Sequence, residues 1–243
     1  ALTGWWAAQF GTPNYAAHGG FCSVNMAAAG LYTIGGSFWE FGEPDWERTR
    51  YFMMFGIAED HDSNPIKLGL GQLKGRPADN RAKFVSINPV RTGYSAIADA
   101  WVGLRPGTDG LFVLSLVHEL IKADKIDLNF LVRYTNAPWL VIEAPGTAEH
   151  GLIARDENGE QLCFGTLRNA VVSALRPDVA PQLIGAVTLP DGHQARTVFE
   201  LMLARYLDPK YAPENVAATI GIDAATIKRI AAELAHAAFE QTI

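Results

Sequence analysis

The sequence predicts an α/β fold in which helices flank a mostly parallel open sheet. Short apolar runs that end at glycine, asparagine or proline recur through the first half of the chain, which is typical of buried parallel strands. Longer segments whose apolar residues recur at helical spacing lie between these runs. Strands that alternate with helices in this way form βαβ units, so consecutive strands run in the same direction.

Three apolar runs are the expected strands of this sheet: residues 50–56 (RYFMMFG), 83–87 (KFVSI) and 101–104 (WVGL). Each run ends at or is followed by residues that interrupt a strand, namely Gly56, Asn88-Pro89 and Pro106-Gly107. Residues 139–142 are expected to form either a further strand or an extended connection.

Helical spacing predicts the helices that separate and follow the strands. In residues 109–122, Leu116 and Leu120 lie on one apolar stripe, and Asp109 is near the N-terminus, where an acidic side chain is favoured. The other expected helices are a short one after Cys22 and residues 66–73, 127–134, 196–206, 213–219 and 224–238.

Composition divides the chain into four segments. Residues 1–46 are rich in glycine and aromatics and are assigned to a neighbouring domain, and residues 47–142 are the α/β core. Residues 143–195 contain a turn signal, Asp-Glu-Asn-Gly, between apolar runs, which predicts a hairpin within a surface insertion. Residues 196–243 are a helical return segment.

Length and charge exclude several classes of protein. A chain of 243 residues with 49% hydrophobic residues allows one large domain or two small ones. Its net charge of −6 lacks the basic excess of a nucleic-acid binder, and two cysteines are too few for a disulfide scaffold. No apolar run reaches the roughly 18 residues of a membrane-spanning helix. Because it opens without Met just before Trp5-Trp6, we expect a piece of a longer chain.

The strand-end loops form the candidate site, because ligands of open parallel sheets bind beyond the carboxyl ends of the strands. Gly56 and Gly107 permit close approach of the backbone to a ligand, and Arg91 can pair with a phosphate. The carboxylate of Asp60 or Asp109 can accept two hydrogen bonds from the N1–H and N2–H₂ edge of guanine. These features predict a purine nucleotide diphosphate, although no GxGxxG fingerprint occurs, and ordinary turn chemistry is the alternative.

Two further residues are candidates for metal binding. Cys22 precedes an expected helix, and a thiol in that position has a lowered pKa and is a good ligand for soft metals. The alternative for Cys22 is a buried structural cysteine. His61 lies in an acidic loop, where a metal site and a solvated polar loop are both compatible with the sequence.

Four motifs occur in order along the chain: CSVNMAAAG from Cys22, the loop from Phe55 to Pro65, the segment from Lys83 to Thr92 and the stretch from Ala98 to Asp109. Their order and spacing resemble those of the molybdopterin oxidoreductases of the dimethyl sulfoxide reductase superfamily. The resemblance covers roughly residues 14–135 and returns at about 213–240.

Members of that family hold molybdenum, or sometimes tungsten, through two molybdopterin guanine dinucleotides, and a protein side chain commonly completes the metal sphere. The resemblance therefore implies that Cys22 is the metal ligand and the catalytic residue. It also implies that His18 contacts the cofactor. It further implies a Rossmann-like domain that binds one guanine dinucleotide through Phe55, Gly56, Glu59, Asp60, His61, Asp62, Asn88, Pro89, Arg91, Thr92, Gly107, Thr108 and Asp109.

The activity that the resemblance implies is oxygen-atom or electron transfer on a small inorganic oxyanion or sulfur compound, carried out by a longer catalytic subunit. A 4Fe-4S cluster is expected only in an N-terminal part outside this sequence, because no cysteine cluster is present. The implied partners are the remaining domains, an iron–sulfur subunit for electron transfer and a quinone-linked membrane subunit. Neither nucleic acid nor a direct membrane span is expected. A cytoplasmic location is favoured, and a periplasmic one stays open.

Ser23 bears on the branch of the family. Formate dehydrogenases usually have His directly after the metal ligand and periplasmic nitrate reductases tend to have Met, so both are disfavoured. The stretch from Trp5 to Gly30 looks most like quinone-linked enzymes that oxidise sulfite or reduce thiosulfate or polysulfide. The alternatives are a formate- or nitrate-type molybdoenzyme, a non-catalytic scaffold subunit that has lost the metal, and a free-standing nucleotide-binding module.

Overall fold

The structure is a computed structural model that describes residues 2–16, 23–33, 35, 44–57, 65–176 and 178–241. Its contacts divide the chain into a unit of residues 1–45 and a unit of residues 46–243.

The described residues of the first unit form the helices α1 (Leu2–Phe10) and α3 (Ser23–Thr33). The helix after Cys22 is as predicted. Helix α1 was not predicted, because its apolar residues do not gather on one stripe. In α1 the rings of Trp6 and Phe10, one helical turn apart, stack at 5.1 Å between centroids.

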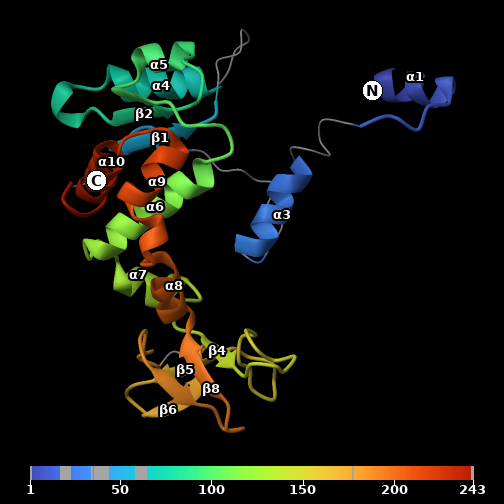
Figure 1. Ribbon diagram of the computed structural model, residues 1–243, viewed down its shortest axis with the longest axis vertical. Helices are drawn as coiled ribbons and strands as arrows, with labels where there is room; N and C mark the ends of the chain where they lie inside the picture. Colours follow the sequence, from blue (N-terminus) through green and yellow to red (C-terminus); the bar gives the residue numbers. More distant parts are fainter. Residues whose placement is uncertain are drawn as a thin grey trace. The chain divides into compact units, whose positions relative to one another are not determined.

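A three-stranded parallel sheet confirms the prediction for the first half of the second unit. Its strands β1 (Tyr51–Phe55), β2 (Lys83–Ile87) and β3 (Ala100–Val102) lie in the order β1-β2-β3. Helices α4 (Pro65–Gly75) and α5 (Gly93–Ile97) pack on one face of the sheet. Helices α6 (Asp109–Lys122), α9 (Pro213–Ile220) and α10 (Ala224–Phe239) pack on the other (Figure 1).

Alternation along each strand gives this sheet two separate cores. On β2, Val85 and Ile87 face α6, α9 and α10, and both are fully buried. Phe84, which directly precedes Val85, faces the opposite side of the sheet. There it packs with Leu70 and Leu73 of α4. Because both faces are covered, the strand reads as a continuous apolar run rather than as an alternating one.

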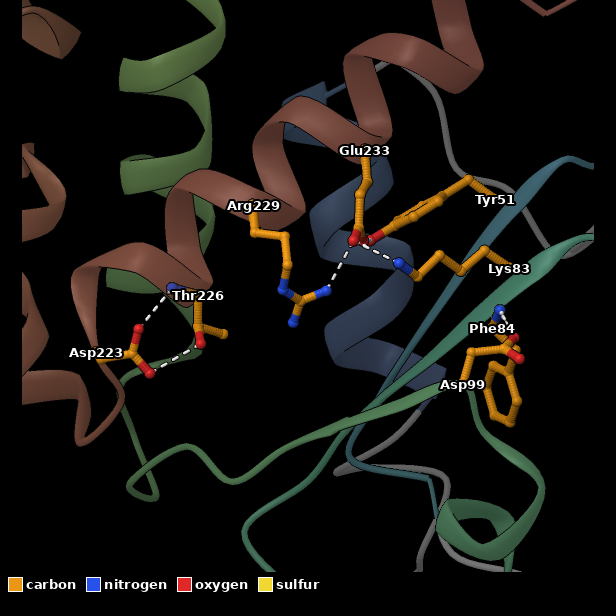
Figure 2. Close-up of polar contacts among 8 residues, drawn as sticks. All are labelled: Tyr51, Lys83, Phe84, Asp99, Asp223, Thr226, Arg229 and Glu233. Atoms are coloured by element: carbon orange, nitrogen blue, oxygen red, sulfur yellow. Dashed lines mark hydrogen bonds and ion pairs between the residues drawn. The ribbon is translucent and has the colours of Figure 1, made fainter.

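A polar cluster fastens α10 to the sheet. The carboxylate of Glu233 accepts hydrogen bonds from Tyr51 Oη at 2.9 Å, from Arg229 Nη1 at 2.8 Å and from Lys83 Nζ, as Figure 2 shows. Burial alone would raise the pKa of Glu233, but these three donors outweigh burial and hold the pKa below its ordinary value. Burial and the hydrogen bond to Glu233 raise the pKa of Tyr51. The cluster therefore ties β1, β2 and α10 together through one carboxylate.

The remaining strands are antiparallel, and this corrects the expectation of a single mostly parallel sheet. Strand β4 (Leu140–Glu143) pairs with β8 (Gln194–Thr197), which pairs with β7 (Ala186–Thr188). Strands β5 (Leu162–Gly165) and β6 (Ala170–Ser173) form a second antiparallel pair. Strand β4 begins in the predicted core, residues 47–142, and β7 lies in the predicted insertion, residues 143–195. Because β8 pairs with both strands, the predicted core and the predicted insertion share one small sheet.

The predicted hairpin within this part is confirmed. Arg155 and Gln161 form an antiparallel bridge, and the N–H of Leu162 donates to the carbonyl of Ala154 at 2.9 Å. The side chain of Asp156 accepts hydrogen bonds from two backbone N–H groups of the turn, which is why an aspartate opens it.

Three further helical segments connect these sheets. They are α7 (Leu128–Tyr134), α8 (Val198–Tyr206) and the 3₁₀ turn η2 (Pro209–Tyr211), and a second 3₁₀ turn, η1 (Ala78–Asn80), precedes β2. In the part of the chain that the structure describes, no helix is both long enough and apolar enough to cross a membrane.

Candidate functional site

The carboxyl ends of the three parallel strands meet at one edge of the sheet, as predicted. Phe55 pairs with Ile87, and Ile87 pairs with Val102, so the strands end in register. Beyond these pairs the backbone ladder continues, with Gly56 N donating to Ile87 O at 2.9 Å and Asn88 N to Val102 O at 3.1 Å. The three predicted loops therefore begin side by side.

Two glycines leave this edge open. Gly56 has a φ of 66° and Gly107 a φ of 81°, which a residue with a side chain adopts only with strain. A Cβ added at either glycine would meet no other atom within 4 Å among the described residues, so space is open above both. Open space beside exposed backbone suits a ligand that approaches the main chain closely, as a dinucleotide does.

Asn88 holds the strand ends together. Its side-chain nitrogen donates to Ile57 O at 3.3 Å, its side-chain oxygen accepts from Val90 N at 3.0 Å, and the residue is buried. These contacts use the amide within the loops. Its neighbour Pro89 is exposed. The structure thus gives Asn88 a structural role at the site.

Arg91 and Thr92 supply groups that can meet an anion. Arg91 is exposed and lies over the ring of Trp101, 5.4 Å from its centroid. Within the described ranges, Arg91 forms no ion pair with a carboxylate. Thr92 Oγ1 is buried and has no hydrogen-bond partner among the described residues, so it can donate to or accept from a ligand.

The loop after β3 brings Asp109 to the same edge. Thr108 Oγ1 donates to Arg105 O at 2.7 Å, which closes the turn before α6. Asp109 is the first residue of α6 and is exposed. Arg105 Nη1 donates to Ala218 O at 3.1 Å, so the C-terminal end of α9 anchors this loop. Neither Arg105 nor Trp101 was predicted as a site residue, because their contacts are made across the fold.

Phe55 is the last residue of β1 and stays a predicted cofactor contact. Its ring packs against Phe112 of α6, with 6.2 Å between centroids, within the core. His18, Cys22, Glu59, Asp60, His61 and Asp62 lie outside the described residues.

A cavity of about 770 Å³ lies in the antiparallel part, but none of the predicted site residues lines it. Its apolar wall includes Leu162 and Leu189, and among its polar groups Ser173 donates to Glu160 at 2.6 Å. The strand-end edge is therefore the better candidate site.

The chain is similar to catalytic components of enzymes that contain molybdopterin. It is 48% identical to a subunit of the sulfite dehydrogenase from Allochromatium vinosum over 252 aligned positions, which cover 100% of this chain and 25% of that protein. It is 32% identical to the molybdopterin-containing subunit of thiosulfate reductase from Salmonella typhimurium, over 54% of this chain and 16% of that protein. No protein-family model matches the chain.

A solved structure has the same fold at low sequence identity. The acetylene hydratase of Pelobacter acetylenicus matches 92% of this chain and 21% of its own, with a TM-score of 0.52 and 17% identity. The chain spans about a quarter of the length of the sulfite dehydrogenase relative, with a smaller share of the other two. The match to the sulfite dehydrogenase relative runs through the whole chain and includes all three strand-end loops, and so the chain belongs to the molybdopterin oxidoreductases of the dimethyl sulfoxide reductase superfamily.

Proposed function

We propose that the chain is part of the catalytic subunit of a molybdenum oxidoreductase that acts on a small inorganic oxyanion or sulfur compound. The observation that carries the proposal is the 48% identity, along the whole chain, to a component of a sulfite dehydrogenase. Sulfite is accordingly the substrate we favour.

The strand-end edge would bind one guanine dinucleotide of a bis-molybdopterin guanine dinucleotide cofactor. The order β1-β2-β3 supports a Rossmann-like role, in which nucleotides bind beyond the strand ends. Gly56 and Gly107 would admit the diphosphate to the backbone, and Arg91 and Thr92 would hold its oxygens. Asp109 would accept the two N–H groups of the guanine edge. These residues fit the group, since open backbone, an exposed guanidinium and a hydroxyl that no described residue engages lie at one edge.

The metal would be held by Cys22, with His18 beside the cofactor. When bound, the cofactor supplies the change in oxidation state that accompanies transfer of an oxygen atom or a hydride equivalent. The role of this chain is to orient the cofactor and to balance its negative charge through groups such as Arg91.

Partners follow from the same proposal. The rest of the catalytic subunit would close over the second pterin and carry a 4Fe-4S cluster. Electrons would then pass to an iron–sulfur subunit and from there to a quinone-linked membrane subunit. We place the catalytic subunit in the cytoplasm. The sulfite dehydrogenase relative is itself one subunit of its enzyme, which supports an assembly of this kind.

The direct test is turnover by the complete natural protein, with an artificial electron acceptor for oxidation of sulfite or formate and a reduced artificial electron donor for reduction of nitrate or thiosulfate. Sulfite-dependent reduction of the acceptor supports the proposal. Activity with formate, nitrate or thiosulfate but not with sulfite would move the assignment to another branch. Absence of all four activities, in protein that contains the cofactor, would contradict the substrate assignment.

A further inference from the structure

Trp101 is held in place from two sides at the edge of the parallel sheet. Its indole N–H donates to the carbonyl of Asn88 at 3.0 Å. Its ring also lies against the backbone of Gly103, where an added Cβ would stand 2.7 Å from the ring carbon Cη2. Because Gly103 has no side chain, the Trp101 ring can pack against its backbone. The hydrogen bond to Asn88 fixes the rotation of the ring.

The fixed indole carries Arg91 on its face. The guanidinium carbon of Arg91 lies 5.4 Å from the ring centroid, within the range of a cation–π contact. An arginine side chain on a surface loop otherwise samples many rotamers, and the freedom lost on binding weakens the contact with an anion. The aromatic surface reduces that loss before the ligand arrives.

The cation on this surface lies next to the other polar groups of the site. Thr92, the next residue, has a buried Oγ1 without a partner among the described residues, and Asn88 joins the loops after β1 and β2. Arg91 thus places an exposed guanidinium beside the point where Asn88 joins the two loops. Trp101 is half-exposed, at 38%, so its ring also forms part of the surface at this edge.

We infer that Trp101 is a positioning residue of the nucleotide site: it acts through Arg91 and sets that guanidinium toward a phosphate of the guanine dinucleotide. This inference rests on the proposed function, since it names how one part of the same site is organised. Trp101 lies in β3 and not in a strand-end loop, yet by this inference it slows release of the nucleotide.

A double-mutant cycle in the complete natural protein tests the coupling. The variants are Arg91→Ala, Trp101→Leu and the double variant, each purified with its cofactor. The measurement is the rate at which guanine nucleotide is lost at raised ionic strength, followed by chromatography after acid hydrolysis. Raised salt is used because it weakens phosphate contacts.

Arg91→Ala should release the guanine nucleotide about tenfold faster or more, because it loses a charged hydrogen bond. Trp101→Leu should release it about two- to fivefold faster, because it loses the aromatic surface under Arg91. The double variant should release nucleotide at the rate of Arg91→Ala alone, because Trp101 acts only through Arg91. Trp101→Phe, which keeps a ring, should restore most of the retention. If Trp101→Leu does not fold, Trp101→Met, which also lacks a ring, gives the same cycle in the two Arg91 backgrounds.

Trp46 provides a matched control, since it packs with the α4 face of the sheet against Gly69 and its neighbours. Trp46→Leu should lower stability and leave the release rate unchanged. Independent, multiplied effects of Arg91→Ala and Trp101→Leu would overturn the inference, and so would an unchanged rate in Trp101→Leu. Wild-type protein that carries no guanine nucleotide would instead overturn the proposed function itself.

Discussion

Arg105 and Ala218 join the loop after β3 to the end of α9. Nη1 of Arg105 donates to the carbonyl of Ala218 at 3.1 Å, and the backbone N–H of Arg105 donates to Ile220 O at 2.8 Å. A cation at the C-terminal end of a helix also interacts favourably with the helix dipole. Residues more than a hundred positions apart thus hold the loop that contains Gly107 and Asp109.

Arg105→Ala should loosen this loop. The loss of the side-chain hydrogen bond and of the charge at the end of α9 should cost about 1 kcal/mol of stability. Hydrogen exchange should become faster at residues 106–109 and at the end of α9. Arg133→Ala, which removes an exposed arginine of α7, is the control and should leave exchange at 106–109 unchanged. Equal exchange in wild type and Arg105→Ala would show that the anchor is not needed.

Glu233 should make the attachment of α10 dependent on pH. Because its pKa is lower in the folded protein than the ordinary 4.5, the folded state favours the carboxylate. The stabilisation is therefore present above about pH 4.5 and is lost as the pH falls through the lowered pKa. Glu233→Gln should be less stable than wild type at pH 7, and the difference should shrink as the pH falls below 4.5.

Urea unfolding at pH 7 and below pH 4.5 measures this difference. Glu157→Gln, at an exposed position in the 156–159 turn, is the control for loss of one carboxylate. A difference between wild type and Glu233→Gln that stays constant across this range would mean that the cluster does not lower the pKa of Glu233.

Asn88→Ala should separate the strand-end loops. It removes two part-buried hydrogen bonds, to Ile57 O and from Val90 N, and each such bond contributes about 1 kcal/mol. Unfolding by urea gives the loss of stability, and bound guanine nucleotide per chain should fall as well. Asn158→Ala, in an exposed turn, should change neither quantity. If Asn88→Ala is less stable but keeps its full nucleotide content, Asn88 contributes to folding and not to nucleotide binding.

The parallel sheet could be predicted from the sequence because each strand carries its own signals. The run at 83–87 is apolar and Asn88-Pro89 stops it, so β2 has the predicted bounds, and α6 does as well. The antiparallel sheets could not be predicted in this way. β4 pairs with β8, about fifty residues later, and strands of three or four residues carry too little pattern to indicate a partner.

The candidate site, like the fold, could be predicted only in part. That the loops after β1, β2 and β3 share an edge follows from parallel order alone, and the structure has that order. The contacts of Arg91 with Trp101 and of Arg105 with Ala218 depend on packing between distant segments. Local sequence shows that these side chains are cationic or aromatic, and only the fold shows what they meet.

Cys22→Ala should abolish or severely impair turnover in the complete natural protein while the pterin nucleotides stay bound. The proposed role of the thiol is to bind the metal, and the nucleotide is held elsewhere, at the strand ends. Activity and nucleotide content are measured on the same preparation. Cys163→Ala is the matched control, because Cys163 is a buried free thiol in β5, and activity should persist. Wild-type turnover by Cys22→Ala would show that Cys22 is not the metal ligand.

The most direct test of the account is metal and pterin analysis of the complete protein, purified natively from cells shown to make the cofactor. Plasma mass spectrometry gives the metal, and fluorescence of the oxidised pterin gives the cofactor. We expect about one molybdenum or tungsten and two pterins per chain. Protein with neither metal nor pterin would contradict the proposed function and would leave the chain as a scaffold that keeps the fold without the chemistry.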